Sequence, residues 1–379
     1  MTTMTPTTAL LLLALVICIP TLLPRLLQSP QFRAYLNRRR TRNGTYKSTQ
    51  QSSEITSLRV YPIKSCRGFE TTSTTQCMTG LDLDRLWMIV DEKTHVFLTI
   101  RQIPEMTLIS TGYREGADGG ELVISIDKTE EKHGGSIAVP SHPSESWLSS
   151  NTTLAHDLKI WDTTTDGYVY NNSVGINQLL SRFLNRSVVL VYKGPSPRIL
   201  KGNGDPRVLG RVQNTNFPDV LPVLIASQAS IDELNSRLRK QGHEEISIER
   251  FRPNIIIRGT GEGWIEDSWK TVRISEFESE PLDASALEKG SQSPSEGLTY
   301  DIVARCGRCQ VPNVDPVTAE KHKTQPWDTM MAYRRVDEGL KYKPCFGMLG
   351  VPREEGSIRV GMRFEVLEET SEHRYIKGF

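Results

Sequence analysis

The stretch ARCGRCQVPNVDP, Ala304–Pro316, places two thiols, Cys306 and Cys309, among arginines. A redox-active Cys-x-x-Cys of the thioredoxin type lies where a strand leads into a helix of a βαβ unit. Here Pro312 and Pro316 follow the second cysteine, and proline blocks a helix because it lacks the backbone N–H and clashes with the preceding turn. The stretch therefore argues against a thioredoxin-like fold.

The same stretch leaves three interpretations of the two thiols open. A structural zinc site needs four N or S ligands, usually as two close pairs, but the chain has no second such pair and its seven histidines are dispersed, so the ligands would have to be distant. Alternatively, Arg305 and Arg308 would lower the pKa of a neighbouring thiol and favour the thiolate, the form that binds soft metals. The third interpretation is a pair of buried structural cysteines.

Outward from this stretch, short segments rich in β-branched and aromatic residues recur between turn residues from position 55 onward, which is typical of strands. The segments are 57–63 (SLRVYPI), 86–91 (LWMIVD), 96–100 (VFLTI), 106–110 (MTLIS), 121–126 (ELVISI), 158–162 (LKIWD), 167–170 (GYVY), 187–193 (SVVLVYK), 222–226 (PVLIA), 254–259 (NIIIRG), 270–276 (KTVRISE) and 358–369 (IRVGMRFEVLEE). Barrel closure would remove the exposed edges of so many short strands.

Two helices are predicted among these strands. One begins with Ser173 as its N-cap, and the other covers 227–241 and ends at Gly242. The result is an α+β, β-rich fold with peripheral helices, in which residues 55–200 form a β-barrel-like domain and 215–379 a second β-barrel domain. The polar stretch 278–297 is expected to be a surface insertion.

The N-terminal region differs in composition from the rest. Residues 8–27 are apolar over about the length that crosses a hydrocarbon core. We expect residues 1–30 to be a membrane anchor and 31–54 a basic, flexible linker, with a cleaved signal or an organelle presequence as the alternatives. Because the positive charges follow the apolar span, the main body of the protein is expected on the cytosolic face.

The overall charge and the cysteine content exclude two classes of protein. All seven basic residues before Ile55 lie in the terminal region, and without them 39 basic residues face 45 acidic ones. An acidic body of this kind argues against a nucleic-acid partner. Six scattered cysteines in 379 residues do not form a disulfide framework, which favours a reducing compartment.

Cations occur repeatedly beside predicted buried strands. Lys64 and Ser65 lie at a turn after the strand of RVYPIKSCRG, Arg85 precedes LWMIVD, and Arg252 and Asn254 precede IIIRG. Lysine with a hydroxyl in a tight turn is one way to bind phosphate. Each arginine alone also fits a solvated surface residue or half of an ion pair, but their shared setting predicts a convergent anion site.

At this point a family resemblance can be stated. The blocks RVYPIKSCRG, DRLWMIVD, TIRQIPEMTLIS, FPDVLPVLIASQASIDELNSRL, RFRPNIIIRG, EDSWKTVRI and RCGRCQVPNVDP occur in this order, and together they resemble MOSC-domain proteins with an N-terminal MOSC β-barrel domain. Within that family the chain is most similar to the mitochondrial amidoxime-reducing components. The resemblance extends from about Ile55 to the C-terminus.

The resemblance implies a molybdenum–molybdopterin cofactor and assigns residues to it. Cys309 corresponds to the protein ligand of molybdenum and hence to the catalytic residue, with Cys306 as a structural neighbour. The residues that correspond to cofactor-binding positions are Lys64, Ser65, Arg85, Asp219, Arg252, Asn254 and Arg308. Two departures concern substrate range: the Asp-Thr-Gly turn that usually follows Asp315-Pro316 is replaced by VTAE, and Val220 replaces a hydroxyl-bearing residue.

The activity that the resemblance implies is the reduction of small N-hydroxylated substrates such as amidoximes and hydroxylamines. Electrons would come from NADH through a flavin reductase and a haem-b cytochrome, and the chain has no nucleotide-binding glycine motif of its own. The expected location is the mitochondrial outer membrane, with the endoplasmic reticulum as the alternative. The alternative function is a molybdenum-cofactor carrier or sulfur-delivery module, although the chain lacks the pyridoxal-phosphate-dependent portion of the cofactor sulfurases.

Overall fold

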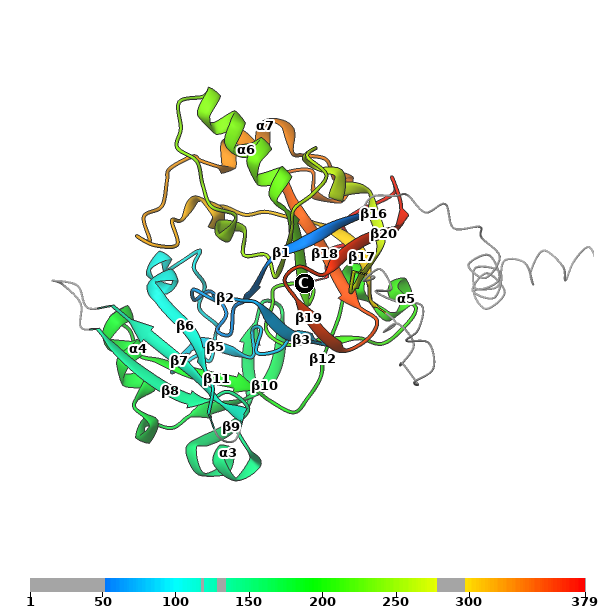
Figure 1. The fold of residues 1–379 in the computed structure, drawn as a ribbon. Helices are drawn as coiled ribbons and strands as arrows, with labels where there is room; N and C mark the ends of the chain where they lie inside the picture. Colours follow the sequence, from blue (N-terminus) through cyan, green and yellow to red (C-terminus); the bar gives the residue numbers. More distant parts are fainter. Residues whose placement is uncertain (1–51, 117–118, 128–133, 278–296, 379) are drawn as a thin grey trace, which may run out of the picture. The chain divides into compact units, whose positions relative to one another are not determined.

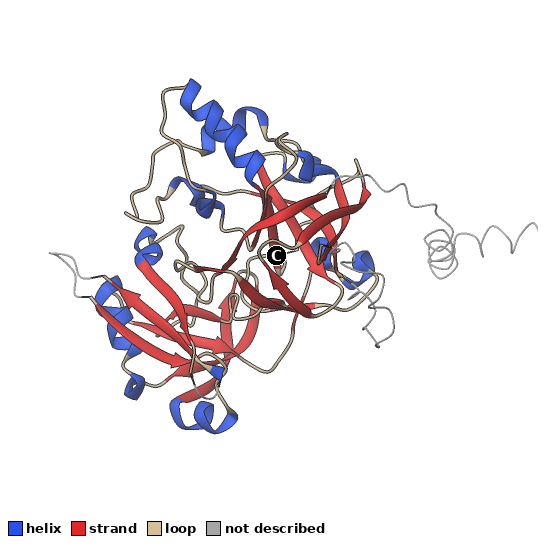
Figure 2. Ribbon diagram, in the orientation of Figure 1, coloured by secondary structure: helices blue, strands red, loops and turns tan. Residues whose placement is uncertain are grey.

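Seven strands close into a ring, in the order β15, β14, β18, β17, β16, β20, β1 and back to β15. Figure 1 labels β1, β16, β17, β18 and β20 of this ring. The computed structural model describes residues 52–116, 119–127, 134–277 and 297–378. The strands of the ring are β1 (Ser52–Val60), β14 (Val223–Ser227), β15 (Ile255–Ile257), β16 (Trp269–Ser275), β17 (Leu298–Gly307), β18 (Cys345–Pro352) and β20 (Arg363–Glu369). The expectation of a β-rich protein with a closed barrel and few helices is confirmed (Figure 2).

The odd number of strands explains why one pair of neighbouring strands in the ring is parallel and is connected through a helix. Seven neighbours cannot all be antiparallel, because strand directions would have to alternate around an odd cycle. The parallel pair is β14 with β15, and the other six pairings are antiparallel. A parallel pair needs a long connection, and here helix α6 (Gln228–Lys240) supplies it. Its apolar stripe, Ile231, Leu234 and Leu238, packs against Ala226 of β14 and Phe346 of β18.

Strand β1 joins the ring although it lies more than 160 residues before β14 in the sequence. It pairs with β15 on one side, where Leu58 lies opposite Ile255, and with β20 on the other, where Ser53 lies opposite Phe364. A short strand, β2 (Phe69–Thr71), extends the sheet from β1. The domain ranges 55–200 and 215–379 remain a prediction. The chain before residue 200 nevertheless supplies one strand of the barrel, β1.

The remaining strands form smaller sheets beside the barrel (Figure 1). The four-stranded sheet contains β5 (Trp87–Asp91), β11 (Val188–Lys193), β10 (Thr163–Tyr170) and β9 (Thr152–Ile160). One three-stranded sheet contains β6 (Ile109–Arg114), β7 (Glu121–Ile126) and β8 (Gly135–Pro140), and another contains β19 (Gly356–Arg359), β3 (Ser73–Cys77) and β4 (Gly80–Leu81). The two strands β12 (Arg198–Ile199) and β13 (Asn214–Thr215) pair only with each other. Among the described residues, the other α-helices are α3 (Glu145–Asn151), α4 (Ile176–Leu184), α5 (Pro206–Leu209) and α7 (Trp327–Tyr333).

Two strand predictions in the first half of the chain are wrong. Residues 96–100 make only isolated bridges, at Val96 and Phe97. Residues 106–108 belong to a 3-10 helix that runs from Pro104 to Leu108, and β6 begins only at Ile109. Proline at the first helical position has a φ angle that suits a helix, and it lacks the backbone N–H that a strand would use as a donor. Pro104 therefore favours the helical conformation of the residues that follow it.

The two helix predictions have different outcomes. Helix α6 and its stop at Gly242, which has a φ of 78°, are confirmed. The other helix begins at Ile176, later than predicted, because Ser173 lies in a 3-10 turn (Asn172–Val174) and Gly175 adopts a left-handed φ of 77° before the helix starts. A residue in the left-handed region interrupts a right-handed helix, so Gly175 separates the two helical segments.

The expected anchor at residues 8–27 and nearly all of the 278–297 insertion lie outside the described residues. Among the residues that the structure describes, none of the helices has both the length and the apolar character to cross a bilayer.

Glu266 is a fully buried carboxyl group in the 3-10 helix Ile265–Ser268, just before β16. Burial raises the pKa of Glu266 to about 7, and the nearby Ser230 hydroxyl offsets this only in part. The unfolded chain has a Glu pKa of about 4.3. Folding above that pH therefore favours uptake of a proton, so this carboxyl lowers stability as the pH rises from about 4.5 to about 7.

We expect the Glu266→Gln variant to be more stable than the wild type by about 3 to 4 kcal/mol at pH 8, because the folded and unfolded pKa values differ by about 2.7 and each unit corresponds to about 1.36 kcal/mol. The difference should vanish near pH 4, where Glu266 is protonated in both folded and unfolded chains. Denaturant unfolding at the two pH values measures this. Glu262→Gln, at an exposed position four residues earlier, is the control. Equal stability of wild type and Glu266→Gln at pH 8 would contradict the prediction.

Candidate functional site

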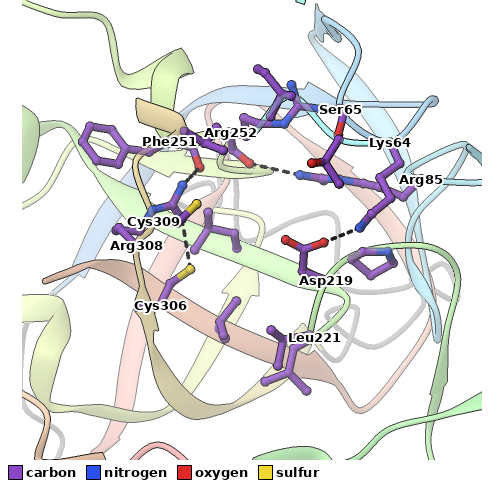
Figure 3. Close-up of a pocket in the computed structure, with 18 of the residues that line it drawn as sticks. Lys64, Ser65, Arg85, Asp219, Leu221, Phe251, Arg252, Cys306, Arg308 and Cys309 are labelled. Atoms are coloured by element: carbon purple, nitrogen blue, oxygen red, sulfur yellow. Dashed lines mark hydrogen bonds and ion pairs between the residues drawn. The ribbon is translucent and has the colours of Figure 1, made fainter. Parts of the chain in front are cut away.

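A cavity of about 370 Å³ is lined by all eight residues that the sequence analysis predicts for a cofactor site (Figure 3). These residues are Lys64, Ser65, Arg85, Asp219, Arg252, Asn254, Arg308 and Cys309. They come from five separate stretches of the chain: the turn after β1, the loop before β5, the loop before β14, the loop before β15, and the loop after β17. The fold thus brings the predicted cations and the thiol into one concave space.

The buried Lys64 and the partly exposed Asp219 form an ion pair on one side of this cavity (Figure 3). The Lys64 ammonium also donates to the carbonyl of Phe217 at 2.9 Å and is 5% exposed. Burial lowers the pKa of Lys64 to about 8, although the attraction of Asp219 works in the other direction. Burial alone would raise the pKa of Asp219, but Lys64 and Arg101 outweigh it and hold that pKa well below its usual range.

Three residues around the cavity adopt left-handed backbone conformations, Ser65 (φ 71°), Arg85 (φ 50°) and Arg252 (φ 57°). Non-glycine residues in this region are uncommon and cost free energy, and they cluster at functional sites. The guanidinium of Arg85 lies 4.6 Å and that of Arg252 4.3 Å from the centre of the Tyr61 ring. The fold therefore holds two like charges beside one aromatic ring, with a strained backbone at both arginines.

Asn254 has a supporting place in this arrangement. Its side-chain amide donates to Asp84 Oδ1 at 2.9 Å and to the Arg59 carbonyl at 3.2 Å, and its Oδ1 accepts from the Leu224 backbone at 3.1 Å. Asp84 in turn binds Arg85 at 2.5 Å. Asn254 therefore connects β1, β14 and the Arg85 loop, and its donors are already engaged with the protein.

The two thiols lie in the cavity wall with different arginine partners. Cys309 Sγ accepts from Arg101 Nε at 3.3 Å, and Cys306 Sγ accepts from Arg308 Nη1 at 2.9 Å. Arg308 also donates to the Phe251 carbonyl at 2.7 Å. Cys309 packs against the apolar side chains of Ile100, Val311 and Val314, whereas Cys306 packs with a different cluster. The two cysteines of the Cys-x-x-Cys therefore lie in different environments within one loop.

The expectation that Arg305 acts on these thiols is wrong. Its Nη1 donates to the His373 carbonyl at 2.9 Å and its Nη2 to the Asp267 carbonyl at 3.0 Å, with Asp337 at 3.6 Å. Arg305 is in β17, where successive side chains point to opposite faces, so it points away from its neighbour Cys306. It belongs instead to an ionic cluster with Asp267, Asp337 and Arg334.

The structure adds residues that the sequence analysis did not select. Arg101 donates both to Cys309 and, at 2.9 Å, to Asp219, and its guanidinium lies 4.7 Å from the centre of the Trp161 ring. Trp161 itself donates to Asp219 Oδ1 at 3.2 Å. Arg101 lies in the block TIRQ, which carried the family resemblance. It sits at a turn, however, and not beside a buried strand, so the pattern of a cation next to an apolar strand does not select it.

The residues present fit an anionic group in this cavity. Arg252 and Arg308 both line the cavity, and Arg252 Nη2 and Arg308 Nε are buried donors without a hydrogen-bond partner among the described residues. Leaving buried donors unpaired costs free energy, and burial lowers the pKa of Arg252, with the Arg85 charge adding to the effect. A phosphate bound in the cavity would offset the positive charges of Arg252 and Arg85. Within the described residues, no group of three or more His, Cys, Asp or Glu side chains is placed to hold a metal, so the interpretation as a protein-only zinc site has no support there.

The chain matches two known domain families and several known proteins in sequence. Residues 52–187 match the MOSC N-terminal beta barrel domain, and residues 213–365 match the MOSC domain. Mitochondrial amidoxime-reducing component 1 of Danio rerio is 27% identical over 81% of this chain and 82% of its own length. The human mitochondrial amidoxime reducing component 2 is 28% identical over 82% of this chain and 83% of its own. Molybdenum cofactor sulfurase of Arabidopsis thaliana is 30% identical over 80% of this chain, which corresponds to only 33% of that longer protein.

Proposed function

The chain belongs to the MOSC-domain family, and on that premise we propose that it is a molybdenum-cofactor-dependent reductase of N-hydroxylated compounds such as amidoximes and hydroxylamines. The observation that carries the proposal is the convergence of one thiol, Cys309, with Lys64, Ser65, Arg85 and Arg252 in a single cavity. A soft metal takes a thiolate ligand, and a pterin phosphate needs fixed cations. The cavity offers both.

Each residue has a stated task in this proposal. Cys309 would bind molybdenum, and Arg101 would fix the orientation of its sulfur through the Nε donor. Arg85, Arg252 and Ser65 would hold the phosphate of the molybdopterin, and Lys64 with Asp219 would line the pterin. The cofactor would supply the redox chemistry while the protein orients it. Each turnover consumes two electrons and two protons and releases the oxygen of the N-hydroxyl group as water.

The proposed electron source is a partner chain, an NADH-dependent flavin reductase acting through a haem-b cytochrome. The relatives that this chain matches over most of their own length are named mitochondrial amidoxime-reducing components. These names support a mitochondrial location for this chain. We further propose that residues 8–27 attach the protein to the outer membrane.

Two measurements test the proposed function. Purified protein should contain about one molybdenum per chain by elemental analysis, and with a supplied electron chain it should reduce benzamidoxime to benzamidine. Protein that lacks molybdenum after expression in a cofactor-producing host would overturn the proposal.

A second candidate function is a cofactor carrier or sulfur-delivery module, which the 30% identity to molybdenum cofactor sulfurases supports. Such a protein would bind the cofactor but would not reduce amidoximes. Molybdenum-loaded protein that leaves benzamidoxime unchanged, with the electron chain shown to be active on a positive control, would favour this function.

The low pKa of Lys64 predicts a pH dependence of cofactor retention. Below pH 8 its ammonium is charged and attracts an anionic cofactor, and as the pH rises through about 8 that charge is lost. We expect molybdenum to dissociate about tenfold faster at pH 9.5 than at pH 7, as measured by metal content after timed dialysis. In Lys64→Arg the side chain stays charged, so the rates at the two pH values should be alike. A wild-type rate that does not change with pH would contradict the prediction.

A further inference from the structure

A second cavity, of about 420 Å³, adjoins the first and shares Asp219 and Val220 with it. Its walls come from Asp162 and the first residues of β10, from the segment 196–201 that contains β12, from Thr215 of β13, and from Gly378 near the C-terminus. None of the roles proposed above uses this space except through the shared aspartate.

The lining of the second cavity is rich in hydrogen-bond donors. Five hydroxyl-bearing residues face it, together with two cations, Arg198 and Lys201. The hydroxyls of Thr163 and Thr215 are engaged with the carbonyls of Ile160 and Thr79. The other three hydroxyl-bearing residues are Thr164, Thr165 and Ser196, and Thr164 is exposed.

Arg198 is the central cation of this cavity, and its guanidinium is fixed in place on one side. Nη1 donates to the carbonyls of Asn216 at 3.2 Å and Pro218 at 2.8 Å. Within the part of the chain that the structure describes, Nε and Nη2 make no hydrogen bond and are not sealed from solvent. The planar fork of an arginine therefore has oriented donors available to a ligand.

The charges around Arg198 do not balance. The carboxylate that acts on it is Asp219, which already pairs with Lys64 and with Arg101. Three cations thus share one carboxylate. The other carboxylate on the cavity wall, Asp162, is exposed to solvent. A cation removed from water without its own counter-ion is costly, and burial lowers the pKa of Arg198 accordingly.

We propose that the second cavity is an oxyanion subsite built on Arg198, with Lys201 and the Thr164 hydroxyl as supporting donors. The ligand is a carboxylate or phosphate group, carried either by the substrate or by a free anion. A substrate that carries its anion here would extend past Asp219 toward Cys309 in the first cavity. This substrate-borne form rests on the proposed reductase function, whereas the anion subsite itself does not.

The experiment uses cofactor-loaded protein, so that the phosphate-binding arginines of the first cavity are occupied. The kinetics of benzamidoxime and 4-carboxybenzamidoxime are compared, and calorimetry measures direct binding of inorganic phosphate and of 4-carboxybenzamide, which has no N-hydroxyl group. The variants are Arg198→Gln, Lys201→Gln and Thr164→Val. Arg207→Gln is the control, because Arg207 is an exposed arginine paired with Asp205 outside the cavity. Lys201→Gln and Thr164→Val keep the contacts of Arg198 with the backbone near Asp219, so they test the subsite without disturbing that segment.

The expected result is a KM for 4-carboxybenzamidoxime about tenfold below that for benzamidoxime at similar kcat. The KM for benzamidoxime divided by the KM for 4-carboxybenzamidoxime should fall toward one in Arg198→Gln. In Lys201→Gln the same ratio should fall only partly. Equal KM values with phosphate binding that depends on Arg198 would identify a free anion as the ligand. If neither the carboxylated compounds nor phosphate bind the wild type more tightly than they bind Arg198→Gln, the proposal is overturned. If benzamidoxime is not reduced at all but phosphate binding still depends on Arg198, the reductase function fails and the subsite stands.

Discussion

The Cys309→Ala variant is expected to lose more than nine-tenths of its molybdenum and all measurable benzamidoxime reduction. A thiolate is the protein ligand that a soft metal selects, and Cys309 Sγ lies in the cavity with an arginine donor, Arg101 Nε, at 3.3 Å. Alanine offers no ligand, and among the described residues no other cluster of metal-binding side chains is available as a substitute. Elemental analysis and the visible absorption of the purified variant measure the loss.

Cys306→Ala is the matched control for this prediction. It removes the second thiol of the same loop, whose sulfur accepts from Arg308 and not from Arg101. We expect this variant to retain its metal and most of its activity, with a small change in stability because Cys306 is only partly buried. Thermal unfolding of both apo variants checks that they fold. If Cys306→Ala loses molybdenum and Cys309→Ala keeps it, the assignment of the two thiols is reversed.

The second large effect is expected at the arginine pair beside Tyr61. Arg252→Gln should weaken cofactor binding by about 100-fold, because a charge-assisted hydrogen bond to phosphate is lost from a site where Nη2 has no protein partner. The apo protein should unfold at or slightly above the wild-type temperature, since the variant also removes a desolvated charge that lies near Arg85. Loss of binding without loss of apo stability distinguishes a ligand-binding residue from a structural one.

Arg258→Gln is the control for Arg252→Gln. Arg258 follows β15, is exposed, and pairs with Glu54 at the surface, so its replacement should leave molybdenum content unchanged. Molybdenum retention is measured by elemental analysis after dialysis against chelator-free buffer. An Arg252→Gln protein that keeps its cofactor as well as the wild type would refute the assignment of this arginine to the phosphate.

The sequence predicted the cavity well where a residue has a fixed relation to a buried strand. Arg85, Arg252 and Lys64 each adjoin a strand whose apolar residues enter the core, so the closure of the barrel and its neighbouring sheet determines where these cations meet. The pattern of cations next to apolar runs is local and visible in one sequence. The same pattern selected Asn254, which lines the cavity, but its hydrogen bonds to Asp84 and the Arg59 carbonyl give it a structural task that no local pattern reveals.

Other features could not be predicted because they depend on direction or on distant partners. Arg305 and Cys306 are adjacent in sequence and point to opposite faces of β17, and only the partners Asp267 and Asp337 show which face the arginine takes. Arg101 reaches Cys309 across 208 positions of the chain. Arg198 is anchored by carbonyls 18 and 20 residues away, in a segment without regular structure.

Strand β1 has a consequence for how this protein can be made and divided. The first described strand completes a ring whose other members begin at residue 223, so the contacts that close it are among those most separated in the chain, and high contact order slows folding. During synthesis the nascent β1 must wait for β15 and then β20 to emerge. A fragment expressed from residue 213 onward would leave β15 and β20 as open edges, which are prone to aggregation, whereas a circular permutant that links Ser52–Val60 directly after β20 would keep the ring intact.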